Sequence, residues 1–223
     1  MKRRLFDHRL FYDRADAGQL LAEHVGIFAS PDLIALGLAR GGVPIAAEVA
    51  AHLRCDLDVI VARKIGAPDS PELALGAVTA SGGRYVNDEL IRQVDVSQEY
   101  VDRVAAEQSS EARRQEERLR GRRPLPQLEG RVVMLVDDGL ATGATMRAAA
   151  RSVQHQRPTM LIVATPVGSP QGCRDLRDDA DEVVCLYRPD PFWAVGLYYD
   201  HFEPVEDSTV REILDRYAAR HAA

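Results

Sequence analysis

The stretch VMLVDDGLATGAT, residues 133–145, joins an apolar run to two adjacent acids and then to a loop of small residues. The apolar run, extended to 131–138, is typical of a buried strand, and residues 144–156 after the loop have a helical pattern. Small residues let backbone N–H groups come close to a ligand, and a helix N-terminus carries a partial positive charge. The stretch therefore predicts a strand, a loop and a helix that together bind an anion such as phosphate.

The two acids, Asp137 and Asp138, need a different partner, because carboxylates repel phosphate. Paired acids accept hydrogen bonds from neighbouring sugar hydroxyls or act near a magnesium ion, so a ribose 5-phosphate fits both halves of the stretch. The segment contains neither the lysine of a Walker A loop nor a G-x-G-x-x-G fingerprint. The alternative is an acidic turn that caps the helix, with Thr142 at the N-cap, but the loop has more features than a cap needs.

Apolar runs alternate with helical patterns along the rest of the chain. Strands are expected at 33–39, 57–63, 73–80, 131–138, 159–167 and 182–188. Helices are expected at 16–25, 43–53, 88–120, 144–156, 171–180 and 207–221. This alternation predicts an α/β fold with a mainly parallel central sheet flanked by helices. Ligands of such sheets bind beyond the carboxyl ends of the strands, so we expect loops 40–44, 63–72 and 137–145 to converge.

Composition restricts the possible partners. The chain has 223 residues, 46% of them hydrophobic, and a net charge of −6, which favours a globular domain and does not favour nucleic acid as a partner. Its three widely spaced cysteines favour reduced thiols in a cytoplasmic protein. We expect no signal peptide, because the basic N-terminal segment contains no apolar h-region. We expect no membrane partner, because no apolar run reaches the roughly 18 residues that a span requires.

Residues 133–145 resemble the phosphoribosyl-pyrophosphate (PRPP) signature of type I phosphoribosyltransferases. The resemblance implies that Asp137 and Asp138 bind the ribose 2- and 3-hydroxyls and contact a magnesium ion indirectly. It also implies that the 5-phosphate lies in the loop formed by Ala141, Thr142, Gly143, Ala144 and Thr145. The expected fold is one phosphoribosyltransferase-like domain over 1–223. Its expected parts are a core at about 33–190, a helical insertion at about 88–123, and a C-terminal hood and helix at 190–223.

Two further segments fit the same family. LARGG (38–42) resembles its pyrophosphate-binding loop, which implies that Arg40, Gly41 and Gly42 contact PRPP, with Arg40–Gly41 as a candidate cis peptide. ARK (62–64) resembles the point where members place cations on pyrophosphate, which implies catalytic roles for Arg63 and Lys64 beside a mobile loop. Taken alone, the first segment could be a plain turn, and the two cations could be solvated surface side chains.

The implied reaction is displacement of pyrophosphate from PRPP by a nitrogenous base or related small acceptor, with magnesium as cofactor, in a homodimer. Hypoxanthine–guanine members carry an aspartate where this chain has Ala141, so that class is not favoured. The chain is most similar to a bacterial branch of the family without an assigned acceptor. The alternative function is a non-catalytic regulatory protein that binds PRPP or a nucleotide on the same fold.

The acceptor pocket is the least defined part of the expected site. Phe192 and Trp193, in the aromatic segment 190–202, are candidates to stack on a base, and the alternative is that the segment fills the core. The charged segment 97–123 is expected to be a helix in solvent or at a dimer contact, with pairs such as Glu99–Arg103 and Glu116–Arg120.

Overall fold

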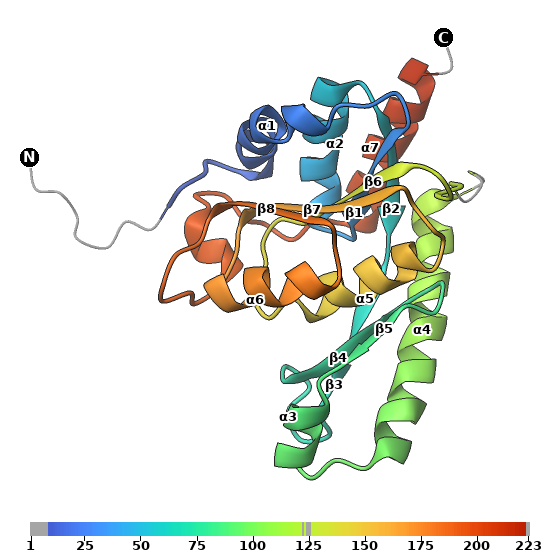
Figure 1. The fold of residues 1–223 in the computed structure, drawn as a ribbon, viewed down its shortest axis with the longest axis vertical. Coiled ribbons are helices and arrows are strands. Elements are labelled where there is room, and N and C mark those ends of the chain that lie inside the picture. The colour runs from blue at the N-terminus through green and yellow to red at the C-terminus, as the bar shows by residue number, and fades with distance from the viewer. Residues whose placement is uncertain (1–8, 122, 124–125, 222–223) are drawn as a thin grey trace, which may run out of the picture.

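The computed structural model describes residues 9–121, 123 and 126–221 (Figure 1). A five-stranded sheet forms its centre, with the strand order β2-β1-β6-β7-β8 and every neighbouring pair parallel. The strands are β1 (Leu33–Leu38), β2 (Asp56–Ile60), β6 (Val132–Val136), β7 (Met160–Val167) and β8 (Glu182–Tyr187). The predicted parallel α/β fold is confirmed.

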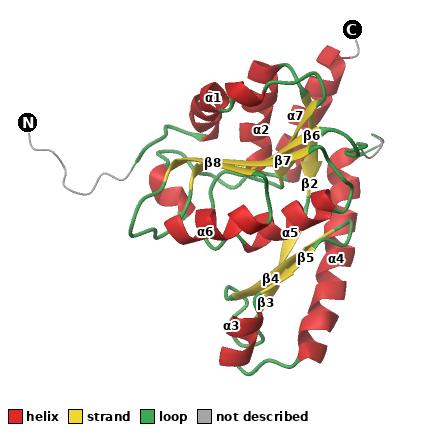
Figure 2. Ribbon diagram, viewed as in Figure 1, coloured by secondary structure: helices red, strands yellow, loops and turns green. Residues whose placement is uncertain are grey.

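Helices cover both faces of this sheet (Figure 2). One face carries α1 (Arg14–His24) and α2 (Gly42–Leu53), with α7 (Asp207–His221) packed beside α2, and the other face carries α5 (Ala144–Gln154) and α6 (Pro170–Asp175). All six residues of β1 are buried as a result. Alternate side chains enter opposite cores, since Leu33 and Ala35 pack with α1 and α2 while Ile34 and Leu36 pack on the α5 side.

The single strand expected at 57–63 is two strands. β2 ends at Ile60, and β3 (Ala62–Gly66) begins a second sheet, where it pairs antiparallel with β4 (Ala74–Thr79), which pairs with β5 (Arg84–Val86). The strand expected at 73–80 is therefore confirmed, but it lies outside the parallel sheet. Charged Arg63 and Lys64 cannot lie in a sheet that is buried on both faces, which explains why the chain leaves that sheet after Ile60.

The second sheet, α3 (Asp88–Gln93) and α4 (Gln98–Arg120) project together from the main layers (Figure 1). Val101, Val104 and Ala105 of α4 pack against Ile65 and Leu75 of the small sheet. The small sheet, which starts at Ala62, thus projects together with the helical segment expected at about 88–123. Position 122, in the expected 88–123 segment, lies outside the described residues.

The chain after β8 returns to the N-terminal segment. The backbone N–H groups of Leu10 and Phe11 both donate to the Tyr198 carbonyl, at 2.8 and 3.0 Å. Tyr198 and Tyr199 are buried in the core beside Phe11. Across the described ranges, no helix is both long enough and apolar enough to cross a membrane.

Candidate active site

The turn between β1 and α2 lies directly against the loop after β6. A methyl group on Gly41 would overlap with Oδ2 of Asp138, and one on Gly42 would overlap with the Val136 carbonyl oxygen. Only glycine fits at position 42, where the obstacle is backbone, and a side chain at position 41 would force the Asp138 carboxylate to move. The cis peptide in this turn joins Ala39 to Arg40, one bond before the expected Arg40–Gly41.

The acid pair is anchored from the first helix. Asp138 accepts a hydrogen bond from Nε of Arg14 at 2.9 Å, and the two side chains are only 15% and 12% exposed. Arg14 also donates to the Glu203 carbonyl at 2.8 Å and lies over the ring of Phe202, 3.9 Å from its centre. The sequence analysis missed Arg14, since no local pattern marks a residue that pairs with an acid 124 positions away.

The two acids have different electrostatic surroundings. Burial raises the pKa of the Asp137 carboxyl well above its usual range, and the nearby Asp138 charge raises it further. Burial also raises the pKa of Asp138, but the Arg14 guanidinium opposes that shift. Asp137 is therefore the more weakly compensated charge of the pair.

The loop of small residues leads into α5 as expected. Gly143 is the N-cap, with φ of +77°, and Thr142 is exposed, so the alternative with Thr142 as the cap is wrong. In the described chain no side chain caps this helix. The Ala141 carbonyl accepts from the Ser169 hydroxyl at 2.5 Å, which fixes the loop to the chain after β7. The first N–H groups of α5 thus remain available for an anion.

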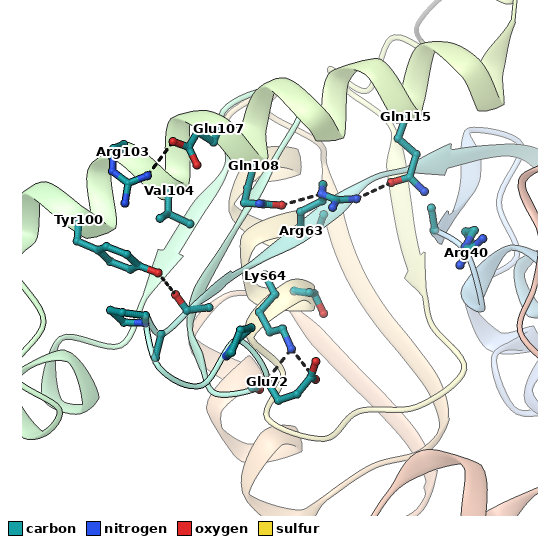
Figure 3. Close-up of a pocket in the computed structure, with 17 residues that line it drawn as sticks. Arg40, Arg63, Lys64, Glu72, Tyr100, Arg103, Val104, Glu107, Gln108 and Gln115 are labelled. Carbon is teal, nitrogen blue, oxygen red and sulfur yellow. Dashed lines mark hydrogen bonds and ion pairs between the residues drawn. The ribbon is translucent and has the colours of Figure 1, made fainter.

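A cleft of about 750 Å³ lies between α4 and β3 with the loop that follows β3, and it reaches the main layers at Arg40 and Thr145 (Figure 3). Arg40 lines it from the turn after β1, Thr145 lines it from the start of α5, and Arg63 and Lys64 line it from β3. Arg40 is 39% exposed and lies 3.7 Å from a carboxylate oxygen of Glu206. The expected convergence is confirmed, because residues from all three loops line this cleft or touch each other through Gly41 and Asp138.

Helix α4 lines the same cleft, which the sequence analysis did not anticipate. Arg63 donates from Nε to Oε1 of Gln108 at 2.8 Å and from Nη1 to Oε1 of Gln115 at 3.2 Å (Figure 3). Lys64 turns away from this helix and donates to Oε2 of Glu72 at 2.9 Å. Lys64 also lies within strand β3, not in the mobile loop expected from residue 64 onward.

One of the two ion pairs predicted within α4 is present. Glu116 binds Arg120 at 2.7 Å as expected, whereas Arg103 binds Glu107 rather than Glu99. One face of the helix packs on the small sheet, so it is not simply an arm in solvent.

The aromatic segment touches the acid pair through residues other than the two expected. Phe192 stacks on Tyr198 in the core with ring centres 5.3 Å apart, and Trp193 is 72% exposed. Among the described residues, neither of them lines the cleft. Instead, Tyr199 donates from its hydroxyl to the Asp138 carbonyl at 2.6 Å, and Val195 packs where Gly139 leaves no room for a side chain.

The acid pair is a limited set of metal ligands. Within the ranges that the structure describes, no three or more His, Cys, Asp or Glu side chains are grouped to hold a metal ion. Magnesium is commonly held by one or two carboxylates together with substrate phosphates. Asp137 and Asp138 therefore fit a magnesium ion that arrives with a phosphorylated substrate.

Comparison with known proteins gives consistent results. The family model described as "Phosphoribosyl transferase domain" matches residues 11–201. Two curated relatives, from Mycobacterium tuberculosis strains CDC 1551 / Oshkosh and ATCC 25618 / H37Rv, are each named "Putative phosphoribosyl transferase". Both are 41% identical over 208 residues, which is 93% of this chain and 47% of each relative. The chain thus spans about half the length of the curated relatives it matches.

A solved structure has the same fold over almost its whole length. The crystal structure of TT1426 from Thermus thermophilus is 44% identical in sequence, with a TM-score of 0.79. The match covers 93% of this chain and 99% of that one.

Proposed function

The chain belongs to the phosphoribosyltransferase family, and we propose that it transfers the 5-phosphoribosyl group of PRPP to a nitrogenous base or related small acceptor. One observation carries this proposal, namely the contact between the Gly41 turn and the Asp138 carboxylate at the carboxyl edge of the sheet. That contact brings the turn proposed to bind pyrophosphate beside the acids proposed to bind ribose.

The donor would lie across this edge of the sheet. Asp137 and Asp138 accept hydrogen bonds from the ribose hydroxyls, and Arg14 holds Asp138 in place for that role. The 5-phosphate lies in the loop at the start of α5, where the backbone N–H groups and helix dipole favour an anion. The loop residues in this role are Ala141, Thr142, Gly143, Ala144 and Thr145.

The leaving group would lie in the cleft. As the acceptor nitrogen bonds to C1, the bond from C1 to oxygen breaks and pyrophosphate departs with the bonding electrons. Arg40, Arg63 and Lys64 stabilise this developing negative charge, and Gly41 and Gly42 let the backbone approach it. Such donors act best where they are already positioned before the reaction.

Magnesium, when bound, would neutralise part of the pyrophosphate charge, and Asp137 and Asp138 would contact it indirectly. The acceptor would bind on the far side of C1, near the segment that touches the acid pair. Tyr199 and Phe202 are better placed for this than Phe192 and Trp193, because Tyr199 contacts Asp138 and Phe202 contacts its anchor Arg14, while Val195 packs against the adjacent Gly139.

A calorimetric titration tests the donor site. PRPP with magnesium should bind to the wild-type protein and should bind much more weakly to an Asp137→Asn/Asp138→Asn variant. If PRPP does not bind, or binds the variant equally well, the assignment fails. A screen of common bases for pyrophosphate release then tests catalysis. Binding without release from any base would favour the non-catalytic regulatory alternative.

A further inference from the structure

Arg63 is held in a different way from the other arginines along α4. Its guanidinium rests on the side-chain amide oxygens of Gln108 and Gln115. These glutamines are seven residues apart, which is close to two helical turns, so both point from one face of α4 into the cleft (Figure 3). Three arginines of the helix pair instead with carboxylates, namely Arg103 with Glu107, Arg114 with Glu111, and Arg120 with Asp58 and Glu116, while Arg113 donates to the Ala80 carbonyl.

An amide oxygen and a carboxylate oxygen both accept a hydrogen bond, but only the carboxylate brings a negative charge. Two amides can therefore fix the direction of the Arg63 fork and leave its positive charge uncompensated by direct partners. The Arg63 charge slightly lowers the pKa of Glu111, but the direct hydrogen bond from Arg114 is the main cause of that shift. Glu111 is thus principally the partner of another arginine.

The uncompensated charge of Arg63 lies in the cleft, where an anionic ligand can reach it. Arg63 shares the cleft with Arg40 and Lys64, so three cations from two elements face one space. Lys64 is paired with Glu72, whose side chain is 95% exposed, so an incoming anion can displace that carboxylate at little cost. No carboxylate has to leave Arg63, because the amide oxygens of Gln108 and Gln115 carry no negative charge that would compete with the anion.

We propose that Gln108 and Gln115 are positioning residues, which hold Arg63 for the pyrophosphate group of the substrate without neutralising it. This inference rests on the proposed phosphoribosyl transfer, and it adds α4 to the pyrophosphate site. Because the guanidinium is already oriented, less conformational entropy is lost when the anion binds.

The test is a pair of charge variants, Gln108→Glu and Gln115→Glu. Each keeps the size of the side chain and the accepting oxygen, but adds a negative charge beside Arg63. An added unit charge within about 10 Å of a bound anion should lower its affinity about tenfold. Calorimetry with magnesium pyrophosphate should show this loss. Ribose 5-phosphate should bind with unchanged affinity, since its site lies at the acid pair and the α5 loop.

Gln98→Glu is the matched control. It adds the same charge to the same helix, about 15 Å from Gln108 along the helix axis. It should leave the affinity for pyrophosphate unchanged. A third variant, Gln115→Met, removes the accepting oxygen without adding charge, and we expect a severalfold loss for pyrophosphate alone.

Three outcomes would overturn the inference: unchanged pyrophosphate affinity in both glutamate variants, an equal loss for pyrophosphate and ribose 5-phosphate, or an equal loss in Gln98→Glu. Failure of the proposed function is a separate result. It would appear as wild-type protein that binds neither ribose 5-phosphate nor PRPP.

Discussion

Arg63 donates to side chains of α4 and Arg120 is the last residue of that helix, but the two arginines occupy opposite chemical surroundings. Arg120 is 8% exposed and donates to the carboxylates of Asp58 and Glu116, at 3.2 and 2.7 Å. Arg63 lies in an open cleft and donates to two neutral amides. A buried arginine with two acids has its charge compensated within the protein, whereas an arginine with two amides keeps its charge for something that is not part of the chain.

Asp58, beside Arg120, and Asp137, in the candidate site, differ in how their charges are compensated. Burial raises the pKa of Asp58, and the Arg120 charge is the largest influence against that shift. Burial raises the pKa of Asp137 as well, but there the next cause is the like charge of Asp138, which adds to the shift. Charges around Arg120 therefore stabilise one another, whereas the like charges of Asp137 and Asp138 oppose each other.

Replacement of Arg120 by methionine should give the largest change in stability. It leaves Asp58 and Glu116 without their cation, and breaking a buried pair in this way typically costs about 3–5 kcal/mol. Urea denaturation should show that loss, while the affinity for magnesium pyrophosphate stays close to that of wild type. Arg114→Met is the control, since Arg114 is 60% exposed, and its unfolding midpoint should hardly move.

Replacement of Arg63 by methionine should lower the affinity for magnesium pyrophosphate and leave the stability nearly unchanged. Hydrogen bonds from charged groups contribute about 1.5–3 kcal/mol, so the affinity for magnesium pyrophosphate should fall at least about tenfold. Stability should change little, because the freed amides of Gln108 and Gln115 face the cleft and can bind water. Calorimetry and urea denaturation on the same variant measure both quantities. A loss of stability as large as that of Arg120→Met would remove the distinction between the two arginines.

The stability cost of Arg120→Met should also depend on pH. The pKa of Asp58 is already raised in the folded protein, and loss of the Arg120 charge should raise it further. Between its usual value and this raised value, the folded state takes up a proton more readily than the unfolded state, so stability increases as pH falls. The deficit of the variant should therefore shrink between pH 7.5 and pH 5, by on the order of 1 kcal/mol. Urea denaturation at both pH values checks this, and an unchanged deficit would exclude Asp58 as its source.

The part of the site that could be predicted is contiguous in the sequence. The strand, acid pair, loop and helix over 133–145 follow one another along the chain, and hydrophobic pattern and helix-terminus chemistry are local properties. The strand and helix were confirmed within one or two residues of their expected bounds. The expectation that the small residues of the loop let backbone N–H groups approach a ligand stays a prediction.

The part that could not be predicted depends on contacts between distant segments. Gln108 and Gln115 are 45 and 52 positions from Arg63, within a helix whose charged pattern resembles any solvated helix. The division of 57–63 between two sheets was missed for a similar reason, since one extended run does not show which strands will pair with its two halves. Phe192 and Trp193 were chosen for aromatic character, which is as typical of a core as of a binding site.

Lys64 provides the smallest and most specific test of how charge compensation affects binding, because it is intermediate between Arg63 and Arg120. It has a carboxylate partner, but Glu72 is 95% exposed and lies at the loop that borders the cleft. If that carboxylate competes with pyrophosphate for Lys64, Glu72→Gln should raise the affinity for magnesium pyrophosphate about twofold, as expected for a weak surface pair. Glu107→Gln is the control, since Glu107 also lines the cleft but binds Arg103. Equal gains in both variants would show a general effect of net charge, whereas a gain confined to Glu72→Gln would show that an exposed acid partner leaves a cation only partly available to the ligand.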